Sequence, residues 1–92
     1  MTGDAPDSAA ASWQVYILRC GDGSLYTGVT TDTERRLQEH NGERPGGARY
    51  TRARRPVSLL WQEACESRSQ ALQREAQIKQ LKRSQKLALA GA

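Results

Sequence analysis

Four side chains that could act together on a phosphate ester lie in the first half of the chain. Tyr16 and Tyr26 stand in two runs of strand-forming residues, and Arg36 and His40 follow four residues apart, on one face of a predicted helix. A guanidinium binds phosphate through a planar set of donors, and a histidine accepts or relays protons near neutral pH. A phenol beside a cation loses its proton more easily and can serve as a base. The combination is typical of a phosphodiester site; the alternative is an exposed helix face and two tyrosines that fill a sheet.

A fifth candidate, Glu75, lies on the apolar stripe of a later predicted helix. The stripe is formed by Ala71, Leu72, Ala76, Ile78 and Leu81. A carboxylate in such a place costs free energy unless it has a cation or a donor as partner. Mg²⁺ is one such partner, because hard cations take oxygen ligands. The residues alone leave two alternatives open, a surface ion pair with Lys79 or an internal pair with Arg36.

The segment 42–55 is rich in arginine and glycine and contains one tyrosine. Cations follow the backbone of a nucleic acid, and an aromatic ring can stack on a base. The candidate nucleic-acid contacts are therefore Arg36, Arg49, Tyr50, Arg52, Arg54 and Arg55. The alternative is a flexible basic loop, which also holds Arg44, without a specific ligand.

The size and charge of the chain favour a small domain with an anionic partner. It has 92 residues, and 14 Lys and Arg against 10 Asp and Glu give a formal charge of +4. We expect residues 1–12 to be a disordered tail and residues 13–92 to form a single domain. Cys20 and Cys65 lack the spacing of a zinc site, and no apolar run is long enough for a membrane span. A cytoplasmic monomer with free thiols is the expectation.

The two tyrosines must be placed by a hairpin. Residues 13–20 and 25–30 are predicted strands, and the intervening Gly21-Asp22-Gly23-Ser24 is a strong turn signal. Paired residues in a hairpin have a constant index sum, and side chains alternate between faces. An even sum, as with a three-residue loop Asp22-Gly23-Ser24, puts both tyrosines on one face, whereas an odd sum separates them. A shared site needs the even sum, which we predict.

The remaining elements are predicted from caps and breakers. A helix should begin at Thr31 as N-cap, with Glu34 reaching back, and end near Asn41. Segment 42–55 reads as a loop and 57–64 as a strand. A second helix should follow the capping box Ser67–Gln70 and reach roughly Lys82, and Ser84 should cap a last helix through Leu89. The order β-β-α-β-α-α predicts the α+β class, a small antiparallel sheet flanked by helices.

Together these residues resemble the GIY-YIG nuclease superfamily, and most of all its compact, stand-alone bacterial members. The first motif of that family appears here as Gln14-Val15-Tyr16 and the second as Tyr26-Thr27-Gly28. The family's helix arginine falls at Arg36, its frequent histidine at His40 and its metal-binding glutamate at Glu75. The resemblance spans residues 13 to about 83. Gln14 and Val15 replace a glycine and an isoleucine, and no match to the family's late asparagine follows Glu75.

This resemblance implies a three-stranded sheet and a metal-dependent endonuclease that hydrolyses phosphodiester bonds in DNA. It implies one Mg²⁺ or Mn²⁺ ion held by Glu75, Tyr16 as general base with Tyr26 in support, and Arg36 neutralising charge at phosphorus. His40 would contact phosphate or move a proton, and whether it or Tyr16 takes the proton stays open. No helix-turn-helix or similar groove reader is visible, so we expect low sequence specificity, with single-stranded, branched or damaged DNA as substrate and DNA repair as setting.

Two other functions fit the residues less fully. The first is a nucleic-acid-binding module with weak or no cleavage, whose affinity would fall steeply with salt. The second is a structural adaptor that binds a protein through a sheet edge or through the basic stretch of Lys79, Lys82, Arg83 and Lys86. No organic cofactor is expected for any of the three.

Overall fold

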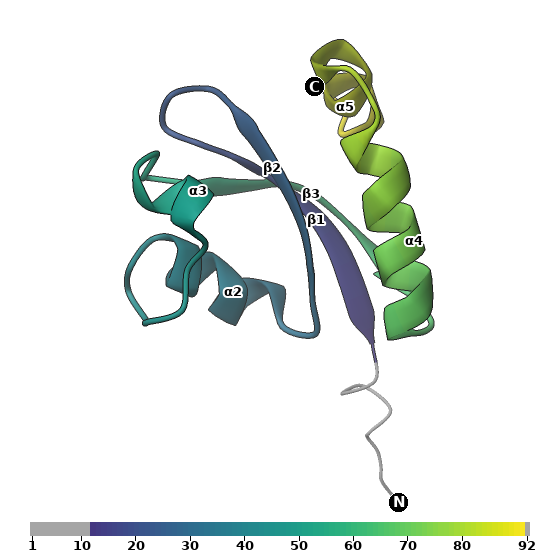
Figure 1. The fold of residues 1–92 in the computed structure, drawn as a ribbon, viewed down its shortest axis with the longest axis horizontal. Helices are drawn as coiled ribbons and strands as arrows, with labels where there is room; N and C mark the ends of the chain where they lie inside the picture. Colours follow the sequence, from purple (N-terminus) through teal and green to yellow (C-terminus); the bar gives the residue numbers. More distant parts are fainter. Residues whose placement is uncertain (1–11, 92) are drawn as a thin grey trace, which may run out of the picture.

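A computed structural model describes residues 12–91, which form a three-stranded antiparallel sheet with helices on both faces (Figure 1). The strands are arranged in the order β2-β1-β3 and comprise β1 (Trp13–Arg19), β2 (Leu25–Thr30) and β3 (Ser58–Cys65). The helices are α2 (Thr33–His40), α3 (Arg49–Arg52), α4 (Arg68–Lys79) and α5 (Arg83–Leu89). The predicted α+β class and element order are confirmed. The predicted tail lies outside the described residues except for Ser12.

The register of the β1–β2 hairpin confirms that Tyr16 and Tyr26 share a face. Tyr16 pairs with Gly28, and Leu18 pairs with Tyr26, so the index sum is even. The loop between the strands is shifted by one residue from the prediction. Gly23 donates to the Cys20 carbonyl at 2.9 Å with φ +86°, and the Cys20 N–H donates to the Ser24 carbonyl at 2.8 Å. The loop is thus a turn followed by a left-handed glycine, a common three-residue hairpin connection.

The sheet separates two small apolar clusters. On the face covered by α2, Tyr16 and Leu18 pack with Cys20, Val57, Tyr26 and Leu37. On the face covered by α4, Val15 and Ile17 pack with Ile78 and with partly buried Leu25, Val29, Leu60, Trp61, Cys65 and Leu89. Figure 1 shows α2 and α3 on one side of the strands and α4 and α5 on the other. Side chains that alternate along β1 therefore serve two different layers.

One polar group lies unpaired inside this arrangement. Thr27 pairs with Ile17 across the hairpin and so belongs to the face covered by α4. Its side chain is buried, and its hydroxyl has no hydrogen-bond partner among the described residues. A buried polar group without a partner costs about 1–3 kcal/mol.

The helix starts differ in part from the predictions. Asp32, not Thr31, caps α2: its carboxylate accepts from the Arg35 N–H at 3.0 Å. β2 ends at Thr30 as predicted, but the Asp32 N–H donates to the Thr30 hydroxyl at 3.1 Å and Asp32 is still extended, so the first helical residue is Thr33. Ser67 caps α4 as predicted, through a 3.1 Å bond from the Gln70 N–H.

Three further differences concern the end of α4, the start of α5 and the segment between α2 and β3. Helix α4 ends at Lys79 rather than Lys82, because the last turn closes through tighter bonds such as Leu81 N–H to the Ile78 carbonyl. Lys82, not Ser84, is the N-cap of α5, and the Gln85 side chain accepts from its N–H at 2.8 Å. The segment predicted as a loop contains α3. Within residues 12–91, no helix has the length and apolar character needed to span a membrane.

Candidate active site

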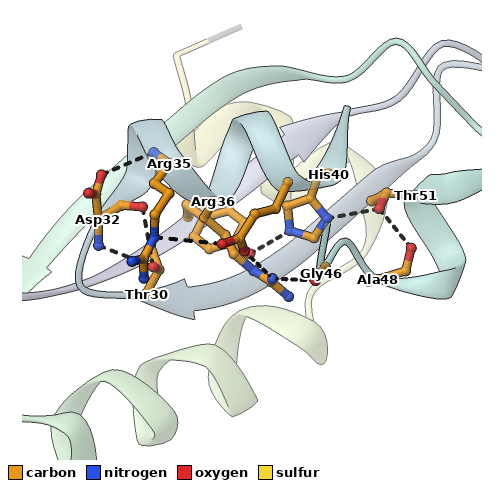
Figure 2. A network of polar contacts seen from close by, with 10 residues as sticks. Thr30, Asp32, Arg35, Arg36, His40, Gly46, Ala48 and Thr51 are labelled. Atoms are coloured by element: carbon orange, nitrogen blue, oxygen red, sulfur yellow. Dashed lines mark hydrogen bonds and ion pairs between the residues drawn. The ribbon is translucent and has the colours of Figure 1, made fainter. Parts of the chain in front are cut away.

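A buried chain of three hydrogen bonds links the first tyrosine to the arginine-rich segment (Figure 2). The Tyr16 hydroxyl lies 2.9 Å from Nε2 of His40, and Nδ1 of His40 lies 2.8 Å from Oγ1 of Thr51. The Thr51 hydroxyl in turn donates to the Ala48 carbonyl at 3.0 Å. Tyr16 is 2% exposed, and His40 and Thr51 are fully buried. Strand β1, helix α2 and helix α3 each contribute one member of the chain.

The end of this chain determines the direction of every bond in it. A carbonyl oxygen only accepts, so the Thr51 hydroxyl uses its proton on Ala48 and accepts from His40 Nδ1. The imidazole therefore carries its proton on Nδ1, and its Nε2 lone pair accepts from the Tyr16 hydroxyl. In this arrangement His40 is a proton acceptor aimed at the Tyr16 oxygen.

The pKa values of the two groups keep both neutral in the free protein. Burial raises the pKa of Tyr16 to about 12; the Arg36 cation opposes the rise, and the charges of Tyr26 and Glu75 add to it. Burial lowers the pKa of His40 from 6.5 to about 4, and the Arg36 cation acts in the same direction. A neutral imidazole next to a protonated phenol is the stable state around neutral pH.

Glycine in β2 makes room for the phenol. A Cβ atom on Gly28 would lie 2.5 Å from the Tyr16 hydroxyl and 2.7 Å from its Cζ atom. Gly28 is also the cross-strand partner of Tyr16, so the Tyr16 ring packs directly against the Gly28 backbone of the neighbouring strand. The close approach explains why a glycine stands at this place in the second motif.

Aromatic rings enclose the imidazole on its other side. The Tyr26 ring lies 5.1 Å from His40, edge to face, and stacks on the Tyr50 ring at 5.7 Å. The Arg54 guanidinium covers the Tyr50 ring at 3.9 Å and forms a 3.1 Å ion pair with Asp22 of the hairpin loop. Tyr50 remains 39% exposed. The stack therefore runs from the buried histidine to the surface.

Arg36 lies close to Tyr16 and His40, and two acceptors hold its guanidinium in place. Its Nη1 atom donates to Oε1 of Glu39 at 2.6 Å and to the Gly46 carbonyl at 2.7 Å (Figure 2). The guanidinium is near enough to Tyr16 to lower the phenol's pKa against the effect of burial. Because Nη1 donates to both Glu39 and Gly46, the guanidinium of Arg36 is held in one orientation. Its other N–H groups stay available as donors.

Glu75 approaches from the opposite layer. It belongs to α4, which covers the other face of the sheet, and yet its charge contributes to the raised pKa of Tyr16. Its side chain is 18% exposed and forms a 3.2 Å ion pair with Lys79. The predicted alternative of a Lys79 pair is thus confirmed, although Glu75 lies deeper than a surface residue. The internal pair with Arg36 is not formed, because Glu39 takes that position.

The donor set around Glu75 suits one kind of metal site. Within residues 12–91, no group of three or more His, Cys, Asp and Glu side chains could hold an ion by itself. Mg²⁺ is commonly bound through one or two carboxylates, with water and substrate phosphates completing its coordination. A single half-buried carboxylate fits an ion that arrives with a phosphate substrate, and it does not fit a resident structural metal.

The predicted nucleic-acid contacts divide into two groups. Arg49 and Arg52 are exposed on α3, beside Tyr50. Arg54 and Arg55 also have internal partners: Arg54 pairs with Asp22 and donates to the Tyr50 carbonyl, and Arg55 donates to the His40 carbonyl at 2.7 Å. The latter two therefore help to hold the site as well as offering charge near it.

Two residues of the site had no place in the sequence-based prediction. Glu39 was detectable in principle, since it lies three residues after Arg36 and four after Arg35, the spacing of helix ion pairs. Thr51 gave no signal, because its contact with His40 depends on how segment 42–55 folds back over α2. Both act on predicted residues and position them.

Comparison with known proteins agrees with this geometry. A family model described as the GIY-YIG catalytic domain matches residues 12–88. A UPF0213 protein of Desulfotalea psychrophila is 51% identical over 87 residues, covering 95% of this chain and 78% of its own. A UPF0213 protein of Halobacterium salinarum is 53% identical over 75 residues, covering 82% of this chain and 95% of its own.

Solved structures give the same result. The solution structure of a UPF0213 protein from Bacillus halodurans is 43% identical with a TM-score of 0.55, covering 87% of this chain and 83% of its own. That of a protein from E. faecalis is 46% identical with a TM-score of 0.57, covering 85% and 81%. The chain therefore belongs to the GIY-YIG nuclease family and, within it, to the small stand-alone UPF0213 proteins.

Proposed function

We propose that the protein is a divalent-metal-dependent endonuclease that hydrolyses phosphodiester bonds in DNA with low sequence specificity. The observation that carries the proposal is the Tyr16–His40–Thr51 chain, which ends beside the oriented guanidinium of Arg36. The Nε2 lone pair of this buried histidine accepts from the phenol, so the imidazole is positioned to take the Tyr16 proton. Hydrolysis needs a group that takes a proton from water, and this chain supplies one.

The pKa values decide how that proton moves. Burial disfavours the charged forms of both Tyr16 and His40, so no phenolate waits as a base in the free protein. The attacking water instead gives a proton to the Tyr16 oxygen while Tyr16 gives its own to His40 Nε2. The water oxygen forms the bond to phosphorus as the ester bond breaks. A bound phosphate brings negative charge, which raises the pKa of His40 and favours this transfer.

Arg36 acts on the phosphate itself. Charge builds on the phosphoryl oxygens as water attacks, and a fixed guanidinium stabilises it without reorganising. Glu39 and the Gly46 carbonyl supply that fixation. Glu39 also neutralises part of the Arg36 charge, which limits how strongly the site holds a substrate in its ground state.

Glu75 would hold the divalent ion. When bound, such an ion polarises a phosphoryl oxygen and stabilises the leaving group. The carboxylate can serve only after the Lys79 ammonium has moved away, and Lys79 is 56% exposed and free to do so. Its place on α4 puts the acid opposite Arg36, across the hairpin that carries both tyrosines.

The residues that would contact the substrate favour unpaired or distorted DNA. Tyr50 presents a partly exposed ring beside the exposed cations Arg49 and Arg52. Because Tyr26 stacks on this ring and Arg54 covers it, the patch offers phosphate contacts and a ring edge rather than a free stacking face. The described helices form no helix-turn-helix or similar groove-reading element. Single-stranded, branched or damaged DNA therefore fits better than a long regular duplex.

The test is incubation with single-stranded, duplex and branched DNA in Mg²⁺, Mn²⁺ or EDTA. Glu75→Gln and Tyr16→Phe should each lower single-turnover cleavage by at least a hundredfold while DNA binding in EDTA persists. Glu66→Gln, the same change at an exposed acid before α4, is the matched control. Binding without metal-dependent cutting of any DNA form would leave the binding module as the function. Cleavage by Glu75→Gln at the wild-type rate would refute the metal assignment.

A further inference from the structure

A second, smaller site lies on the far side of the hairpin from Tyr50. A cavity of about 160 Å³ is lined by Ser24 and Leu25 of the hairpin and by Arg83 and Lys86 of α5. Arg83 donates from Nη1 to the Gly23 carbonyl at 2.6 Å, which ties α5 to the tip of the hairpin. The Ser24 hydroxyl already donates to the Asp22 carboxylate at 2.6 Å, so the cavity offers an anion the two cations of Arg83 and Lys86.

The charges in this cavity are not neutralised by acids. Arg35, Arg36, Arg54, Arg74 and Lys79 each have a carboxylate within ion-pair distance. In the described part of the chain, neither Arg83 nor Lys86 has one. Arg83 uses one of its N–H groups on a carbonyl and keeps the others, and Lys86 keeps three. A small anion with several acceptor oxygens is the ligand that such a set of donors favours.

The cavity lies at the hairpin tip, on the face of the sheet that α4 and α5 cover, whereas Tyr16 and Tyr26 lie on the face that α2 covers (Figure 1). Strand β2 forms the edge of the sheet between these two faces, and Leu25 of the cavity immediately precedes Tyr26 on it. A DNA strand that crosses this edge would therefore contact both sides of the hairpin.

We infer that Arg83 and Lys86 form a phosphate subsite that holds the DNA backbone on one flanking side of the bond to be cut. The inference rests on the proposed function and extends it from the reacting phosphate to that flanking phosphate. The subsite lies on the opposite face of the hairpin from Tyr16, so the DNA strand would reach it over the β2 edge.

Binding in EDTA tests the subsite apart from catalysis. Affinity for a fluorescent single-stranded oligonucleotide is measured across a salt series for wild type, Arg83→Gln, Lys86→Gln and the double variant. Each lost phosphate contact should lower the slope of log affinity against log salt by about 0.7, and the double variant should bind roughly tenfold more weakly at 0.1 M salt. Arg68→Gln, at the opposite end of the α4–α5 pair, is the control and should change the slope by less.

The outcomes separate the subsite from its alternatives. Arg83→Gln also removes the bond to Gly23, so Lys86→Gln, which breaks no such bond, and thermal melts keep loss of folding apart from loss of binding. A slope equal to that of Arg68→Gln would overturn the subsite even if Glu75→Gln abolished cleavage. Inorganic phosphate that stabilises wild type but not the double variant, with oligonucleotide binding unchanged, would assign the cavity to free phosphate and overturn it too. Slope loss without any cleavage would support the subsite and refute the nuclease.

Discussion

The sole histidine of the chain, His40, should titrate far below an ordinary histidine. Burial and the Arg36 cation lower its pKa from 6.5 to about 4, and its proton should reside on Nδ1. Because there is one imidazole to observe, ¹⁵N-correlated NMR reports both the midpoint and the tautomer without assignment ambiguity. A midpoint near 6.5, or a proton on Nε2, would refute the hydrogen-bond chain as described.

The same shift makes folding stability depend on pH with a definite sign. Between the two pKa values, the unfolded chain binds a proton at His40 that the folded protein does not. The contribution of His40 to the free energy of unfolding is therefore fully present above pH 6.5 and is lost as pH falls toward 4. From pH 7 to 4.5 the free energy of unfolding should fall by about 2–3 kcal/mol through this residue.

Urea denaturation across that range measures the loss, with His40→Gln as the matched variant. Carboxylates contribute to both proteins, so the difference between the two pH profiles isolates the histidine. Thr51→Val should lower the midpoint further in NMR titration, because the imidazolium donates from Nδ1 more strongly than the neutral ring and loses that acceptor. Parallel profiles for wild type and His40→Gln would contradict the reasoning, whatever the absolute stabilities.

Three further changes test the surroundings of the site. Gly28→Ala should cost about 1–3 kcal/mol in thermal denaturation and reduce cleavage, because its Cβ would lie 2.5 Å from the Tyr16 hydroxyl; an unchanged Tm would show that the ring is free to move. Lys79→Gln should strengthen Mn²⁺ binding about two- to fivefold by calorimetry, since it frees Glu75 from a partly exposed ion pair, and equal affinity would place the metal elsewhere. Thr27→Val should be neutral or stabilise by about 1 kcal/mol in urea, as the buried hydroxyl has no partner; a clear loss would reveal one.

The parts of the site that follow from local periodicity were predictable. An even index sum for the hairpin places Tyr16 and Tyr26 on one face, and four-residue spacing places Arg36 and His40 on one side of α2. The apolar stripe predicted around Glu75 is confirmed only in part: Ala71 and Ile78 are buried and Glu75 is half-buried beside Lys79, whereas Leu72 and Ala76 are exposed. In each case the relevant geometry repeats every two or 3.6 residues, so neighbouring residues contain the information.

Long-range contacts were not predictable in this way. The bond between His40 and Thr51 joins residues eleven apart, across a segment that looked like a flexible loop and instead contains α3. The caps at Asp32 and Lys82 were missed because competing cap residues, Thr31 and Ser84, lie close to them in the sequence. Charge composition suggested a nucleic-acid partner, but it did not show that Arg54 and Arg55 also support the site from within.

The complete burial of His40 limits how an enzyme built this way could complete a cycle. Its Nδ1 side leads through Thr51 to a carbonyl, which offers no onward route for a proton, and its Nε2 side leads only to the Tyr16 phenol. A proton stored on the imidazole during hydrolysis would have to leave by the way it came. With a pKa near 4 in the empty site, it would leave as soon as the anionic product departs. His40 would then become neutral again, and able to accept a proton from the next DNA strand's hydrolysis, only once the previous product has been released.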